Sequence, residues 1–141
     1  MSSEYVFYGV NSTMKKRIVE ILNYAKEIRN SRFAISGNNK FDIISLEVRK
    51  NQDIFMIDGV IKCLGVERTI EAYVINDKNY KLYLDVKEDD KLLSRTNETF
   101  IVDDEKVIVT TEDVLTDEVY HEEIFFDEEK DYEQLGILLN A

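Results

Sequence analysis

The chain of 141 residues contains no proline, one cysteine, one histidine and five glycines. Average proline usage of about 5% would give roughly seven prolines in a chain of this length. The single cysteine, Cys63, excludes an intramolecular disulfide, and residues 1–10 lack the basic and apolar regions of a secretion signal, so we expect a reducing, cytoplasmic setting. The longest uninterrupted apolar runs span a few residues, far below the ~20 that a membrane-spanning helix needs, which predicts no membrane partner.

These scarcities also argue against the common kinds of reaction chemistry. A closed zinc site needs four Cys or His ligands, whereas Cys63 and His121 are the only two such residues. The glycines follow no phosphate-binding spacing, and the acidic runs follow no EF-hand pattern. We expect Cys63 to be a small core residue and His121 to be a half-exposed strand residue beside carboxylates. The sequence favours a non-catalytic protein and predicts no catalytic residue, no metal site and no cofactor, although an unrecognised catalytic cavity stays open as an alternative.

The residues that are abundant predict one folded domain over 1–141. Hydrophobic residues make up 44% of the chain and charged residues 33%, which is too apolar for a disordered chain. A chain of this length is near the usual size of a single domain and has no linker, repeat or low-complexity segment to divide it.

A single apolar stripe predicts a helix over about residues 13–30, with Ser12 or Thr13 as its N-cap. The stripe consists of Met14, Ile18, Ile21, Leu22, Ala25 and Ile28. The other faces of this helix are basic, through Lys15, Lys16, Arg17, Lys26 and Arg29. We interpret them as a solvated face, or alternatively as a docking surface for the protein's own acidic half or for an anionic partner.

Alternating apolar and polar residues predict strands along most of the remaining chain. The expected strands are 5–8, 33–36, 41–48, 54–63, 66–75, 80–86, 99–103, 106–111 and 119–126, with a loop at about 88–97 and a short terminal helix at 127–139. Turn signals about ten residues apart favour antiparallel neighbours. The fold class is therefore α+β, with the amphipathic helix packed on a long, curved antiparallel meander that is open, two-layered or barrel-like.

The order of these elements resembles two known arrangements. A strand, a long helix and an antiparallel meander resemble hot-dog thioesterase-type domains, and a helix leading into a curved meander is similar to cystatin-like folds. The chain contains no motif of either family, and architecture alone does not determine function.

Charge is divided unequally along the chain. Residues 1–84 carry 13 Lys and Arg against 10 Asp and Glu, whereas residues 85–141 carry 5 against 19. Such a field acts on partners and association rates. It favours a partner protein with a basic surface and argues against direct nucleic-acid binding. The candidate binding residues are the acids Asp103, Asp104, Glu105, Asp117, Glu118, Glu122, Glu123, Asp127, Glu128 and Glu129.

The sequence leaves three functional classes open. The first is a non-catalytic acidic binding protein of the inhibitor, antitoxin, immunity or nucleic-acid-mimic type. The second is an assembly subunit or small chaperone, which would form a homo-oligomer and could come from a phage. The third is a small-ligand or enzymatic cavity between the helix and the curved sheet. They differ in what they require, namely a basic partner, a symmetric interface or a pocket with converging polar groups.

Overall fold

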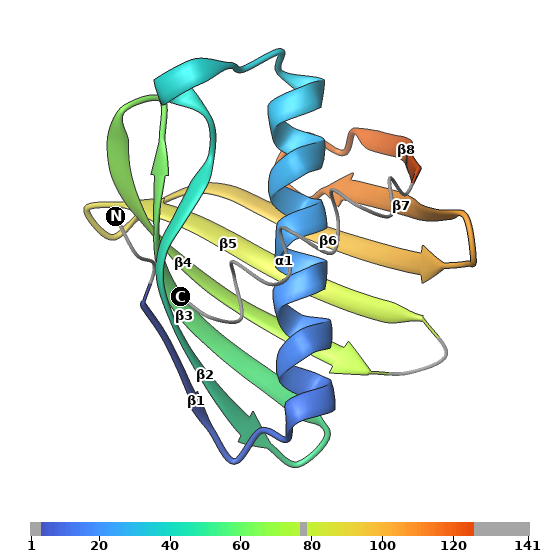
Figure 1. Cartoon of the computed structure of the whole chain (residues 1–141). Coiled ribbons are helices and arrows are strands. Elements are labelled where there is room, and N and C mark those ends of the chain that lie inside the picture. Colours follow the sequence, from blue (N-terminus) through green and yellow to red (C-terminus); the bar gives the residue numbers. More distant parts are fainter. Residues whose placement is uncertain (1–3, 77–78, 126–141) are drawn as a thin grey trace.

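One long helix lies across a single eight-stranded β-sheet (Figure 1). The computed structural model describes residues 4–76 and 79–125 of the chain. In chain order the elements are β1 (Glu4–Tyr8), α1 (Ser12–Arg32), a short 3-10 turn (Gly37–Asn39), β2 (Asp42–Asn51), β3 (Ile54–Cys63), β4 (Val66–Asn76), β5 (Tyr80–Glu88), β6 (Lys91–Val102), β7 (Lys106–Asp113) and β8 (Val119–Phe125). This arrangement confirms the α+β class. The terminal helix expected at 127–139 lies outside the described residues.

The apolar stripe of α1 is buried, as its spacing predicts. Ile18, Ile21 and Ile28 are almost wholly shielded from solvent. The helix begins at Ser12, and its N-cap is Asn11, one residue before the expected Ser12 or Thr13, because the side chain of Asn11 accepts a hydrogen bond from the backbone N–H of Met14 at 2.9 Å. Arg29, expected on the basic outer face of the helix, is buried instead.

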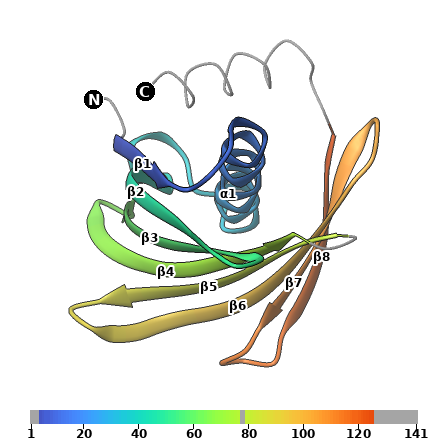
Figure 2. The same ribbon diagram turned by 90° about the horizontal axis from the view of Figure 1, so that it is seen from below.

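The strands follow one another in sequence order across the sheet, from β1 at one edge to β8 at the other. Strands β2 to β8 pair antiparallel, which confirms the meander. Strand β1 pairs parallel with β2, and the helix between them supplies the long crossover that a parallel pair requires. The sheet is strongly curved, and the helix occupies its concave side (Figure 2).

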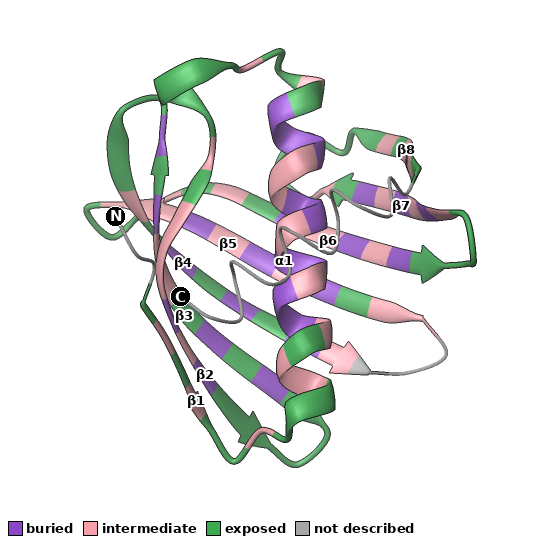
Figure 3. Ribbon diagram, viewed as in Figure 1, coloured by how far each residue is buried: buried purple, intermediate pink, exposed green. Residues whose placement is uncertain are grey.

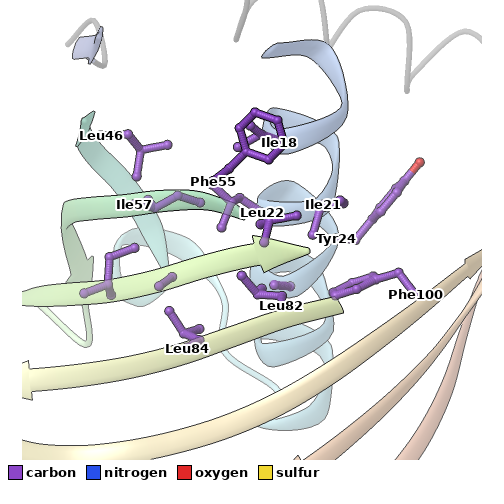
Figure 4. Close-up of a cluster of buried hydrophobic side chains, with 14 of the residues drawn as sticks. Ile18, Ile21, Leu22, Tyr24, Leu46, Phe55, Ile57, Leu82, Leu84 and Phe100 are labelled. Carbon is purple, nitrogen blue, oxygen red and sulfur yellow. The ribbon is translucent and has the colours of Figure 1, made fainter. Parts of the chain in front are cut away.

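Burial alternates along the strands (Figure 3), as expected where successive side chains face the helix side and the open side of the sheet in turn. On the concave, inner side, Ile18, Ile21 and Leu22 of the helix face Phe55, Leu82 and Phe100 of the sheet (Figure 4). Gly59 allows β2 and β3 to come close together there, because a Cβ atom at this position would lie 2.7 Å from Leu46 Cδ2 and 2.9 Å from the carbonyl oxygen of Ser45.

Two further expectations, both about secondary structure, were wrong. Residues 33–36 form no strand: Phe33 caps the helix, and Ala34 turns the chain away with a left-handed backbone, φ 51°. The loop expected at 88–97 is a tight hairpin in which Asp89 and Asp90 both have positive φ, as a type I′ turn requires. The start of β6 looked like a loop because two of its inward positions carry the polar residues Thr96 and Glu98, which breaks the apolar alternation.

Candidate functional site

The inner side of the sheet is filled by the helix. A hollow between the helix and the sheet, lined mainly by apolar side chains, has a volume of about 40 Å³. Pockets that bind small ligands usually have volumes of about 300–1,000 Å³. The volume of this hollow is therefore well below the usual range for small-ligand pockets.

A buried ion pair joins the last turns of α1 to β6. Arg29 Nη1 donates to Glu98 Oε1 at 2.8 Å, and the side chains of the pair are 9% and 0% exposed. Arg29 also donates to Thr96 Oγ1 at 3.2 Å and to the carbonyl oxygen of Ala25 at 3.0 Å. Glu98 Oε2 has no hydrogen-bond partner within the described part of the protein. Because both charges are held by side chains of the fold itself, this pair positions the helix on the sheet.

A second arginine extends this contact to the edge of the sheet. Arg32 donates to Glu122 through Nε at 2.8 Å and to Thr111 Oγ1 at 3.3 Å. Its guanidinium lies 4.1 Å from the centre of the Tyr120 ring. Of the basic residues that the sequence singled out on the helix, Arg29 thus contacts the acidic half of the chain, and Arg32, which the sequence did not single out, does so as well.

The acids that the sequence singled out do not form one surface. Asp103, Asp104 and Glu105 form the turn between β6 and β7, whereas Asp117 and Glu118 belong to the turn between β7 and β8. The eight residues of β7 separate these turns by about 25 Å at ~3.3 Å per residue. Residues Asp127, Glu128 and Glu129 lie outside the described part of the chain.

Several of these acids already have partners within the chain. Glu122 faces the helix and pairs with Arg32, while Glu123 points to the opposite face and pairs with Lys106 at 3.1 Å. Asp103 accepts hydrogen bonds from the backbone N–H groups of Glu105 and Lys106, and these bonds lower the pKa of its carboxyl group. Glu118 accepts a hydrogen bond from the hydroxyl of Tyr120, which raises the pKa of that tyrosine.

A row of carboxylates crosses the outer face of the sheet, the convex face opposite α1. Glu47 of β2 is in register with Asp58 of β3, Asp58 with Glu71 of β4, and Glu71 with Asp85 of β5. Side chains in directly opposed positions have Cβ atoms about 5 Å apart, and like charges there destabilise a sheet. We call these four residues, Glu47, Asp58, Glu71 and Asp85, the carboxylate row.

Three members of the carboxylate row have a basic partner. Glu47 pairs with Arg49, Glu71 with Lys87 at 2.7 Å, and Asp85 with Arg95 through two hydrogen bonds of 2.9 Å. The Arg95 hydrogen bonds hold the pKa of Asp85 below its ordinary value, against the opposing effect of partial burial. No basic side chain of the described residues pairs with Asp58. Asp58 is therefore the one member of the row that has no ion-pair partner among the described residues.

An aromatic row runs beside the carboxylate row on the outer face. Met56, Tyr73, Tyr83 and Asn97 are in register across β3 to β6. The rings of Tyr73 and Tyr83 stack with centres 4.5 Å apart, and Met56 is 46% exposed. Members of both rows line an open groove of about 590 Å³. Asp58 borders both this groove and a second hollow of about 380 Å³ that reaches β1.

Cys63 and His121 do not form a reactive pair on the outer face. Burial raises the pKa of the Cys63 thiol, while Arg68 opposes the rise, so the thiol is a core group as its strand position predicts. His121 is exposed on β8, where its Nδ1 lies 3.2 Å from Thr110 Oγ1. Among residues 4–76 and 79–125 no three His, Cys, Asp or Glu side chains converge to hold a metal ion, and no helix combines the length and apolarity of a membrane span.

The carboxylate row was missed because it depends on strand register. In the sequence, Asp58, Glu71 and Asp85 lie 13 and 14 residues apart, with no local motif to connect them. Period-two alternation identifies each as an outward residue of its strand. Only the pairing of the strands shows that they are neighbours. Comparisons of the chain with protein-family models, with curated proteins and with solved structures found no match.

Proposed function

We propose that this protein is a non-catalytic binding protein that docks the basic surface of a partner protein on the outer face of its sheet. The observation that carries the proposal is the carboxylate row beside the stacked tyrosines, with Asp58, which has no ion-pair partner among the described residues, within the row. Tyrosine, methionine and arginine are enriched in the central parts of protein interfaces, and Tyr73, Tyr83 and Met56 lie on this face. A shallow groove with this lining suits the protruding side chains of a partner better than it suits a small molecule, which needs an enclosing pocket.

The charge of the whole chain supports the same proposal. A net charge of −11 attracts basic partners over the range of the Debye length, about 8 Å at physiological salt. Such long-range attraction raises association rates more than it raises affinity. The carboxylate row is the defined site at which we expect a partner drawn by this general attraction to bind.

A basic decapeptide of alternating lysine, arginine and serine residues is a suitable probe. We expect it to bind saturably at 50 mM NaCl, to shift the NMR signals of outer-face residues on β3, β4 and β5, and to bind much more weakly at 500 mM NaCl. A glutamate-containing decapeptide of equal length serves as the control and should not bind.

Variants distinguish the outer face from the acidic turns. The double variant Asp58→Asn, Glu71→Gln should weaken binding of the basic decapeptide, whereas Asp103→Asn, Asp104→Asn, Glu105→Gln should change it little. Signal shifts confined to the turn at 103–105 would place the site there instead. If the basic peptide does not bind at 50 mM NaCl, the proposed function is wrong.

A further inference from the structure

The outer face offers a carboxylate and aromatic rings, and an arginine side chain makes contacts with both kinds of group. A carboxylate without a basic partner among the described residues, Asp58, borders the groove in which Tyr73 and Tyr83 are stacked. Arginine has a planar guanidinium that bonds carboxylates through paired N–H groups and also stacks on aromatic rings. Lysine carries the same charge, but its ammonium group is a strongly hydrated point charge without a flat face.

The protein itself already contains this arrangement twice. On the outer face, the guanidinium of Arg49 lies 4.6 Å from the centre of the Tyr8 ring and pairs with Glu47, the first member of the carboxylate row. At the end of the helix, Arg32 lies over the Tyr120 ring and pairs with Glu122. In both cases an arginine is held between a tyrosine ring and a carboxylate that come from nearby strand positions.

Asp58 and Tyr73 have the components of a third such site without the arginine. Tyr73 is two residues beyond Glu71 on β4, and Glu71 is directly opposite Asp58, so the ring of Tyr73 is diagonal to the Asp58 carboxylate on the same face. Tyr73 is more than one-third exposed, and in the register of the strands it stands between Met56 and Tyr83. In the other two sites the side chain that contacts both the ring and the carboxylate is Arg49 or Arg32.

We infer that the groove at Asp58, Tyr73 and Tyr83 recognises an arginine side chain of the partner protein and selects it over lysine. The inference rests on the proposed function, because it names the residue of the basic partner that the outer face receives. The guanidinium lies against the tyrosine stack and donates to Asp58, and the aliphatic part of the arginine contacts Met56. The neighbouring acids of the carboxylate row keep their own basic partners, so Asp58 is the acid that remains for the guanidinium.

The test compares two peptides that differ only in the basic residue. Both are ten residues long, with three arginines in one and three lysines in the other, separated by glycine and serine. We expect the arginine peptide to bind roughly threefold to tenfold more tightly at 100 mM NaCl, since a cation over an aromatic ring and a paired hydrogen bond each add modestly at an exposed site. Dissociation constants come from fluorescence anisotropy with the labelled peptides.

Variants of the groove decide whether this preference arises there. Tyr73→Leu and Asp58→Asn should each reduce the ratio of the two dissociation constants towards one, whereas Tyr73→Phe, which keeps the ring, should preserve it. Asp104→Asn, on the distant turn between β6 and β7, is the matched charge control and should also preserve it. Thermal unfolding of each variant shows that the protein is folded at the temperature of the binding measurement.

The possible outcomes separate the inference from the proposed function. Equal, salt-dependent affinities for the two peptides would overturn the inference and leave the binding function in place. An arginine preference that survives both Tyr73→Leu and Asp58→Asn would overturn the assignment to this groove. Absence of binding by either peptide would overturn both the inference and the proposed function.

Discussion

Leu64 occupies a backbone conformation that leucine rarely adopts. It has φ 53° in the turn between β3 and β4 and is followed by Gly65 with φ 78°, so the turn requires positive φ at both positions. The residue is 56% exposed and therefore gains little from burial. Asn followed by Gly is the usual pair for such a turn, because Asn tolerates the left-handed region.

Leu64→Asn should therefore stabilise the protein. We expect the free energy of unfolding to rise by about 1 kcal/mol, the order of the cost of a left-handed conformation in a residue with a branched side chain. Urea unfolding followed by circular dichroism measures the change. Leu115→Asn is the control, because Leu115 is similarly exposed at 51% but has no positive φ. An equal gain in both variants would show that the loss of an exposed apolar side chain, and not the relief of backbone strain, is responsible.

Asp85 makes the stability of the protein dependent on pH. Its pKa is lowered in the folded state, chiefly by the hydrogen bonds from Arg95. A carboxyl group with a lowered pKa contributes stability above its unfolded pKa, about 3.9, and loses this contribution as the pH falls through the folded pKa. We therefore expect the free energy of unfolding to fall less steeply in Asp85→Asn than in the wild type between pH 5 and pH 2. Arg95→Gln should flatten the same curve, and parallel curves for all three proteins would contradict this role.

At the scale of secondary-structure elements, polar contacts determine how α1 sits on the sheet. The apolar stripe of the helix provides the area of contact, but apolar packing has no strong directional preference. The Arg29–Glu98 ion pair and the Arg32–Glu122 ion pair connect the last turns of the helix to particular positions on β6 and β8. Their basic residues also suit the C-terminal end of the helix dipole.

Removing one partner of the Arg29–Glu98 pair should lower the free energy of unfolding more than replacing both partners. Glu98→Leu leaves Arg29 buried without its partner, and such single changes destabilise proteins by about 3–5 kcal/mol. The double variant Arg29→Met, Glu98→Leu should recover much of this loss, because a buried pair replaced by apolar residues is often neutral. A double-mutant cycle of urea unfolding measures the coupling. Simple additivity of the single effects would show that the pair is not coupled as its geometry implies.

At the scale of the whole molecule, repulsion between acidic side chains lowers the stability of the protein, which folds despite it. The carboxylate row places acids opposite one another on four strands. Opposed like charges weaken strand pairing. This cost is consistent with a role for the outer face in binding.

Added salt should raise the stability of the free protein. Screening reduces the repulsion between acids, so we expect the midpoint of thermal unfolding to rise between 50 and 500 mM NaCl. Asp58→Asn should raise the midpoint at 50 mM NaCl and reduce the further gain from salt. Glu105→Gln, on a turn away from the row, should have a smaller effect on both quantities. A midpoint that does not respond to salt in the wild type would show that repulsion within the acidic surface is negligible.

The sequence by itself determined most of the elements of this protein and most of their buried faces. Residues such as Ile18, Ile21 and Ile28 predict the helix because they recur at helical spacing within one short segment. This spacing places them on one face, and that face is buried. Alternation likewise predicts most strands and the burial of Cys63. The same reasoning fails at the start of β6, where buried polar residues paired with a distant arginine do not look like core.

Tertiary structure alone decided which residues became neighbours. The partners of Arg29 and Arg32 lie 69 and 90 residues away in the chain, and no local pattern connects them. The carboxylate row and the tyrosine stack arise from the register of four antiparallel strands, which depends on turn geometry and on the close approach at Gly59. Elements and buried faces that depend on local residue spacing were therefore predictable from the sequence. The candidate binding face depends on pairing between distant segments, so it could be recognised only in the tertiary structure.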